Sequence, residues 1–147
     1  LRWDSLGEFL AVAVSLEELG EKHDNARARL LGQTLDTAVG QLLENNESPS
    51  RKAGELDNRG SHFHLACHWA AALAEQNDDQ DLKAFAAKFS EKLEADKDKI
   101  LEELTVIQGK PADIGGYYHA PADKVCAVMQ PSETLNKILT EFAEAAK

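Results

Sequence analysis

The chain has 147 residues, a length that suits one domain or part of a larger one. Hydrophobic residues make up 43% of it and charged residues 29%, a balance typical of globular proteins with a substantial core. The net charge of -10 argues against nucleic acid and anionic membranes as partners, because phosphate groups are bound by basic surfaces.

Two amphipathic helices are predicted in the first third of the chain. Apolar residues recur at helical spacing over 5–20, where Ser5 and Glu8 fit a capping box. A second apolar stripe predicts a helix over 25–44. Gly32 and Gly40 weaken that helix by up to about 1 kcal/mol each, unless they permit close packing against a neighbour.

A polar loop over 45–60 separates these helices from the next two. Ser61 is a suitable cap for a third helix over 61–76. The apolar periodicity over 79–108 predicts one long fourth helix, and Gly109 is a stop signal at its end.

The segment over 113–130 has no clear period, and we expect an ordered loop there before a last helix over 131–142. The helical periods predict a fold class that is mainly α. Short connections make successive helices antiparallel. We expect an antiparallel helical bundle of about five helices, with the ordered loop before the last one.

The two cysteines, Cys67 and Cys126, are too few for a disulfide framework, and reduced thiols in a cytoplasmic protein are expected. No apolar run approaches the roughly 18 residues of a membrane span, and no signal peptide is visible, so no membrane partner is predicted. Because the chain starts at Leu1 without methionine, we interpret it as a fragment.

The first two helices have a geometric consequence for two of the five arginines. At about 1.5 Å per residue both helices are roughly 25–30 Å long, so an antiparallel hairpin returns residues 48–51 to the neighbourhood of residues 1–4. Arg2 and Arg51 would then share one space beside a helix N-terminus, an arrangement that favours a phosphate. Solvated or surface-paired arginines are the alternative.

Two other polar groups admit functional interpretations. His64 and His68 are i, i+4 neighbours on the predicted third helix, a spacing that permits zinc binding, but no C-x-x-C or H-E-x-x-H pattern accompanies them. We therefore predict no metal site and favour surface or partner-satisfied histidines. Asp57 and Arg59 are interpreted as a structural pair, with residues lining a cleft as the alternative.

Several longer strings carry a resemblance to a known family. They are LRWDSLGEF over 1–9, SPSRK over 48–52, ELDNRGSHF over 55–63, QGKP over 108–111 and DIGGYY over 113–118, followed by Met129 and Pro131-Ser132. In this order and spacing they resemble the C-terminal part of the monomeric isocitrate dehydrogenase family, single-chain NADP enzymes of bacteria.

The resemblance implies that residues 1–147 are a C-terminal fragment of the smaller domain of an α/β two-domain enzyme, contributing to the cofactor cleft. The full-length monomer would oxidise and decarboxylate isocitrate to 2-oxoglutarate with NADP and Mg²⁺ or Mn²⁺. Metal ligands and catalytic residues would lie outside this chain, so the fragment alone is expected to be inactive.

The same resemblance gives the cofactor-binding residues. Arg2 and Arg51 fall on positions that hold the 2′-phosphate of NADP, Asp4 on a cofactor-contacting position, and Trp3 beside it. The sequence departs from the family at His64 and His68, where tyrosines are expected, and at Gln130, where arginine is expected.

The alternative from another functional class is a stand-alone helical interaction module without catalysis. A third hypothesis is a metal-binding helical domain built on His64 and His68. Whether the isolated chain self-associates is left open, since a fragment exposes apolar surface that the remainder of the enzyme would cover.

Overall fold

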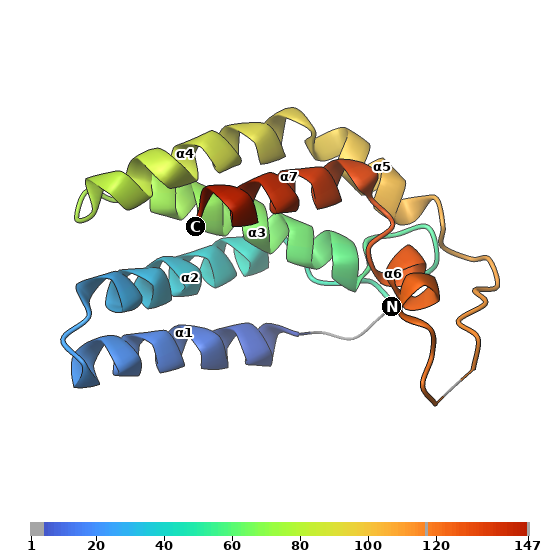
Figure 1. Ribbon diagram of the computed structural model, residues 1–147, viewed down its shortest axis with the longest axis horizontal. Helices are drawn as coiled ribbons and strands as arrows, with labels where there is room; N and C mark the ends of the chain where they lie inside the picture. The colour runs from blue at the N-terminus through green and yellow to red at the C-terminus, as the bar shows by residue number, and fades with distance from the viewer. Residues whose placement is uncertain (1–4, 117, 147) are drawn as a thin grey trace.

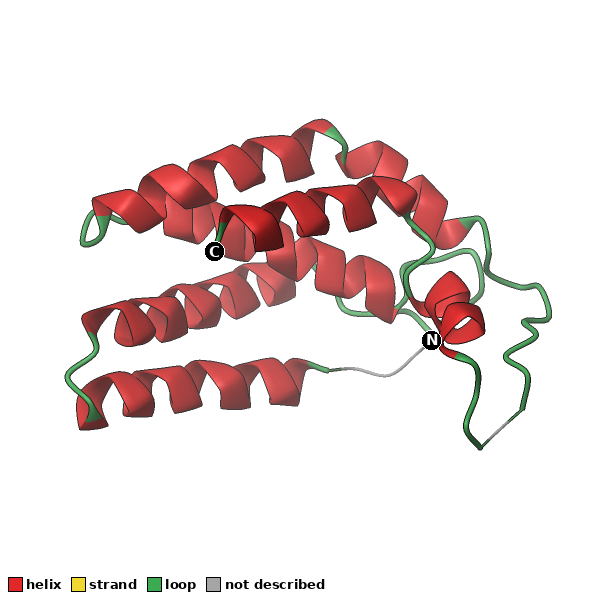
Figure 2. Ribbon diagram, in the orientation of Figure 1, coloured by secondary structure: helices red, strands yellow, loops and turns green. Residues whose placement is uncertain are grey.

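The computed structural model describes residues 5–116 and 118–146, and these residues form helices and loops without a strand (Figures 1 and 2). The mainly α prediction is therefore confirmed. The described residues contain seven helices, not about five: α1 (Leu6–Lys22), α2 (Ala26–Glu44), α3 (Asn58–Glu75), α4 (Gln80–Ala95), α5 (Lys97–Thr105), α6 (Ala122–Met129) and α7 (Glu133–Ala145).

Helix α3 lies at the centre of the arrangement (Figure 1). It packs against α2 on one side and against α4 and α5 on the other, while α7 packs against α4 and α5. Helices α1 and α2 form an antiparallel hairpin, as the short connection between them predicted.

Helix α1 runs two residues past Gly20, which the sequence suggested as its end. Ser5 occupies the N-cap position, but its side chain makes no capping hydrogen bond. Helix α2 begins after Asn25, whose side chain caps it by accepting a hydrogen bond from the Ala28 amide at 3.0 Å.

The two glycines inside α2 differ in their surroundings. A Cβ on Gly32 would lie 2.7 Å from the Ala13 carbonyl oxygen of α1, so the absence of a side chain permits the close approach of the two helices. A Cβ on Gly40 would meet nothing within 4 Å. Close packing therefore explains Gly32 and leaves Gly40 unexplained.

Helix α3 begins three residues earlier than predicted, because Asp57 caps it and Ser61 does not. The Asp57 carboxylate accepts hydrogen bonds from the Arg59 amide at 2.9 Å and the Gly60 amide at 3.3 Å. Aspartate and serine are both good caps, so local chemistry alone did not decide between them.

The predicted long fourth helix is two helices, because Asp96 departs from helical geometry between α4 and α5. Helix α5 ends at Thr105, three residues before the predicted end, and Gly109, with φ of +72°, closes the turn that follows. The predicted loop over 113–130 is also corrected, since it contains the eight-residue helix α6. That helix has no buried residue, which explains why its sequence shows no strong apolar period.

Two apolar clusters form the core, and α3 contributes to both. One comprises Phe63, Cys67, Phe89, Leu93, Ile100, Leu104 and Ile138; the other comprises Ala13, Leu35, Ala38, Val39, Leu42 and Leu65. Because α3 is covered on two sides, it carries apolar residues around most of its circumference.

Helix α1 is covered on one side only. Its apolar residues Leu10, Val12, Val14 and Leu19 are exposed, whereas Ala13 is buried against α2. Over residues 5–116 and 118–146, no helix combines the length and the apolar character that a membrane crossing requires.

Candidate functional site

Residues 45–57 connect α2 to α3, and we call them the Arg51 loop. The loop begins with a hydrogen-bonded helix end: the Asn46 amide donates to the Leu43 carbonyl at 3.1 Å, and the Glu47 amide to the Leu42 carbonyl at 3.0 Å. Asn46 has φ of 56°, the left-handed conformation of a Schellman motif. The direction in which the loop leaves α2 is therefore fixed by backbone contacts.

The middle of the loop closes on itself. The Ser50 amide donates to the Leu56 carbonyl at 2.8 Å, and the Lys52 amide to the Ser50 hydroxyl at 3.2 Å. The Ser50 hydroxyl in turn donates to the Glu55 carboxylate. Arg51 thus lies in a closed turn whose ends are held together.

Gln108, just beyond α5, holds the second half of the loop. Its amide oxygen accepts from the Gly54 amide at 2.8 Å. Its amide nitrogen donates to the Glu55 carbonyl at 3.0 Å and to the Asp57 carboxylate at 3.1 Å. The part of the loop that follows Arg51 is therefore attached to the body of the bundle.

Arg51 itself is exposed, and its side chain makes no hydrogen bond or ion pair in the part of the chain that the structure describes. The other described arginines have partners. Arg27 donates to Asp79 at 2.7 Å, Arg29 contacts a backbone carbonyl at 3.5 Å, and Arg59 is paired with a carboxylate. Arg51 is the described guanidinium that remains open to an anion.

The chain just before α1 lies at the end of the Arg51 loop. The Asn58 side-chain nitrogen, at the first turn of α3, donates to the Ser5 hydroxyl at 3.4 Å. The residue that follows the Arg51 loop therefore lies beside the residue that precedes α1. Arg2, Trp3 and Asp4 lie outside the described residues, so the meeting of Arg2 with Arg51 stays a prediction.

Asp57 and Arg59 form a buried pair beside the loop, with side chains 1% and 9% exposed. Arg59 donates through Nε to Asp57 Oδ2 at 3.0 Å and through Nη1 to the Val128 carbonyl of α6 at 2.7 Å. Burial alone would raise the pKa of the Asp57 carboxyl, but Arg59 and two backbone amides outweigh it and hold this pKa below its usual value. The structural interpretation of this pair is confirmed.

A partly polar cavity of about 490 Å³ lies next to the start of α3. Ser5, Asn58 and His62 contribute to its wall, together with apolar side chains from α5 and α7. Asn58 Oδ1 is buried and has no hydrogen-bond partner. Burial also lowers the pKa of His62, which favours its neutral form.

The two histidines of the zinc hypothesis lie against a carboxylate. His68 Nε2 is 2.6 Å from Glu47 Oε2, and His64 Nδ1 is 2.9 Å from Glu47 Oε1. The first contact is a hydrogen bond; the second has the distance of one but not the direction, so Nδ1 stays unsatisfied. Within the described residues, no group of three His, Cys, Asp or Glu side chains is arranged to hold a metal ion.

Glu47 was missed at the sequence level. It lies 17 positions before His64, and no local spacing connects a residue at the end of one helix with the middle of the next. Only the antiparallel packing of α2 and α3 brings the three side chains together. His68 is thus satisfied by a partner, as the favoured interpretation held, whereas His64 contacts the same carboxylate without a hydrogen bond.

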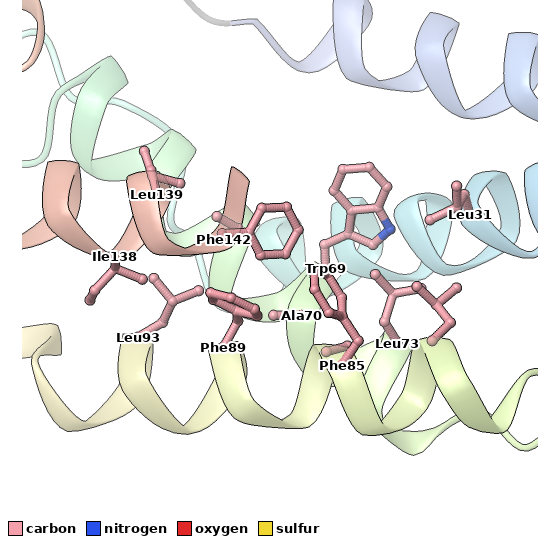
Figure 3. Close-up of a pocket in the computed structure, with 13 residues that line it drawn as sticks. Leu31, Trp69, Ala70, Leu73, Phe85, Phe89, Leu93, Ile138, Leu139 and Phe142 are labelled. Atoms are coloured by element: carbon pink, nitrogen blue, oxygen red, sulfur yellow. The ribbon is translucent and has the colours of Figure 1, made fainter. Parts of the chain in front are cut away.

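A second cavity, of about 320 Å³, is almost entirely apolar and lies between α2, α3, α4 and α7 (Figure 3). Phe85 and Phe89 line it from α4, Phe142 from α7 and Trp69 from α3. The Trp69 indole nitrogen donates to the Thr34 hydroxyl at 3.1 Å, so the ring is anchored in the core. This cavity offers apolar contacts and no group that would carry chemistry.

Comparison with known proteins gives a consistent result. The profile of the family described as monomeric isocitrate dehydrogenase matches residues 1–140. Isocitrate dehydrogenase (NADP) 2 of Mycobacterium tuberculosis is 56% identical over 139 residues, which are 95% of this chain. Isocitrate dehydrogenase (NADP) of Azotobacter vinelandii is 52% identical over 143 residues, 97% of this chain. The chain spans 19% of the length of each of these relatives.

Proposed function

Because this chain belongs to the monomeric isocitrate dehydrogenase family, we propose that it is part of an NADP-dependent isocitrate dehydrogenase. The whole enzyme, acting as a monomer, would convert isocitrate to 2-oxoglutarate and transfer a hydride to NADP. Since this chain spans 19% of the relatives' length, we assign the catalytic centre and the ligands of Mg²⁺ or Mn²⁺ to other parts of the longer protein. Cys67 and Cys126 are free thiols, which suits a cytoplasmic enzyme.

Within that enzyme, this chain would belong to the smaller domain and help to bind NADP at the cleft between the domains. Its specific task would be to hold the 2′-phosphate with Arg2 and Arg51, while Asp4 and Trp3 contact neighbouring parts of the cofactor. The 2′-phosphate distinguishes NADP from NAD, and planar guanidinium groups bind phosphate in a paired geometry.

The observation that carries this proposal is the state of Arg51. Its guanidinium is exposed and makes no described ion pair, although the chain has 26 acidic residues. It also lies in a loop held at both ends, so the backbone that carries Arg51 has little conformational freedom to lose when an anion binds. An open cation on a fixed backbone is suited to recognising a charged ligand.

The position of the loop supports the same conclusion. The Asn58–Ser5 contact brings the end of the Arg51 loop to the start of α1, and Arg2 precedes Ser5 by three residues. The first turn of a helix presents free amides and a partial positive charge, both of which stabilise a phosphate.

The alternative, a stand-alone helical interaction module, is supported by exposed apolar residues, most of all those of α1. Contacts with other parts of a longer enzyme would use the same residues.

The test of the proposed function is the Arg51→Ala substitution in the full-length enzyme, followed by steady-state kinetics. The KM for NADP should rise far more than the KM for isocitrate, and equal rises in both would overturn the assignment.

A further inference from the structure

Glu47 links the start of the Arg51 loop to the middle of α3. Its carboxylate lies between two imidazoles, 2.6 Å from His68 Nε2 and 2.9 Å from His64 Nδ1. The side chains of Glu47 and His68 are each 18% exposed and that of His64 is 11% exposed. This is a largely buried carboxylate with both oxygens in contact with one neighbouring helix, and we call the three side chains the Glu47 clasp.

The Glu47 clasp lies close in the chain to Arg51, the residue proposed to bind the phosphate. Glu47 precedes Arg51 by four positions, and the intervening residues 48–50 are half-buried. The Glu47 amide donates a hydrogen bond to the Leu42 carbonyl at the end of α2. The backbone of Glu47 therefore fixes the direction of the chain after α2, and its side chain attaches this part of the loop to α3. Gln108 holds the other half of the loop, which leaves the Glu47 clasp as the anchor at the start of the loop.

We propose that Glu47 is a positioning residue for Arg51, because its contacts with His64 and His68 fix where the loop presents the guanidinium to the 2′-phosphate. This inference rests on the proposed role of Arg51 in NADP binding. In this role Glu47 would act through Arg51 and would not touch the cofactor. Its contribution is to hold the loop in the binding geometry before the cofactor arrives.

The groups around His64 are compatible with a contact between Glu47 and a neutral histidine. Lys97 at the start of α5 and Glu94 near the end of α4 also face His64, in addition to Glu47 and His68. Burial is the largest influence on His64 and lowers its pKa, while Glu47 opposes that shift. Neutral imidazole nitrogens that carry a hydrogen can contact a carboxylate as donors, so the Glu47 clasp does not need a charged histidine.

The test uses the full-length enzyme with Glu47→Ala and Glu47→Gln. The alanine variant should raise the KM for NADP about 10-fold, as expected on removal of a charge-assisted hydrogen bond, and leave kcat and the KM for isocitrate within about twofold. The glutamine variant keeps an oxygen for His68 and should restore most of the affinity. Failure of glutamine to restore it, or an equal rise in both Michaelis constants, would overturn the positioning role.

A double variant separates this inference from the proposed function. If Glu47 acts through Arg51, Glu47→Ala combined with Arg51→Ala should be no weaker for NADP than Arg51→Ala alone. Additive losses would refute the coupling while leaving the role of Arg51 intact. If Arg51→Ala alone leaves the KM for NADP unchanged, the proposed function itself fails.

Three further variants separate the Glu47 contact from general effects on folding. His68→Gln keeps a nitrogen donor near the position of Nε2 and should behave like the wild type, whereas His68→Leu should reproduce the loss seen with Glu47→Ala. Glu141→Ala breaks an ion pair with Lys92 between α7 and α4, far along the chain from the loop, and should leave both Michaelis constants unchanged. A loss of NADP affinity in this control equal to that of Glu47→Ala would indicate a general structural effect and overturn the inference.

Discussion

Arg59 and Asp57 form a nearly buried ion pair in which Arg59 Nε donates to Asp57 Oδ2 at 3.0 Å. The same carboxylate caps α3 and accepts a hydrogen bond from Gln108 at 3.1 Å, while the guanidinium reaches the Val128 carbonyl at 2.7 Å. One pair of side chains therefore connects the Arg51 loop, α3, the end of α5 and α6.

Asp57→Asn should destabilise the protein strongly. The amide keeps the shape of the side chain but leaves the Arg59 charge buried without its counter-ion, a loss of about 3–5 kcal/mol. Urea unfolding measures the change. Ser61→Ala is the matched control, because Ser61 lies inside α3 and does not cap it, and it should cost less than about 1 kcal/mol. Equal losses in the two variants would contradict the assignment of the cap to Asp57.

The buried His64 and the exposed but partly desolvated His62 should make the protein less stable in mild acid. The pKa values of His62 and His64 are lowered by burial, below about 6.5 for the unfolded chain. The neutral form is therefore favoured in the folded state, so this stability is fully present above about pH 6.5 and is lost as the pH falls through the folded values. The midpoint of thermal unfolding should decrease below about pH 6.5.

His62→Phe should flatten this pH dependence. The phenyl ring keeps the edge contact with Phe9, whose centroid lies 5.0 Å from the imidazole, and removes one titrating group. The exposed His23 provides the comparison, and His23→Asn should leave the slope unchanged. A midpoint that falls just as steeply with acid in His62→Phe would show that His62 does not contribute.

The two glycines of α2 should respond oppositely to alanine. Gly40→Ala adds a methyl group in open space and should stabilise the protein by up to about 1 kcal/mol through helix propensity. Gly32→Ala should destabilise it, because the new Cβ would lie 2.7 Å from the Ala13 carbonyl oxygen and push α1 away. Thermal unfolding of both variants decides the sign, and stabilisation by Gly32→Ala would refute the close packing of α1 on α2.

The two thiols should differ in reactivity. Cys67 is buried between α3 and its neighbours, and burial raises the pKa of its thiol to about 12, so almost no thiolate forms near neutral pH. Cys126 is exposed on α6. A thiol reagent should modify one cysteine in the folded chain and two after denaturation, and Cys126→Ser should remove the fast reaction. Rapid modification of Cys67 in the folded protein would indicate that α3 opens easily.

Arg51→Ala should reduce the preference of the full-length enzyme for NADP over NAD. A charge-assisted hydrogen bond is worth about 1.5–3 kcal/mol, which corresponds to a loss of roughly 10- to 150-fold in the ratio of kcat/KM values. The kinetic constants for NAD should change little, because NAD lacks the 2′-phosphate. Arg27→Ala is the control, since Arg27 is paired with Asp79 at 2.7 Å, and it should leave the preference unchanged.

The helical class and most of the helices followed from the apolar periodicity of the sequence, but one helix and several boundaries did not. Serine is a good cap, which favours a start of α3 at Ser61. The helix is capped by Asp57 instead, whose carboxylate also accepts a hydrogen bond from Gln108 and pairs with Arg59. Helix α6 was missed because it buries no residue, so no apolar stripe marks it. The apolar spacing continues from α4 into α5 across Asp96, so the periodicity gave no sign that the helix is interrupted there.

The sequence by itself determined the helical class and the antiparallel hairpin of α1 and α2, because helix periods and lengths are local properties. It also carried the strings that identify the family. Only the tertiary structure decided which arginine is left open, since a partner such as Asp79 for Arg27 lies 52 positions away. The same holds for Glu47, whose contact with His64 and His68 exists only once two helices pack side by side.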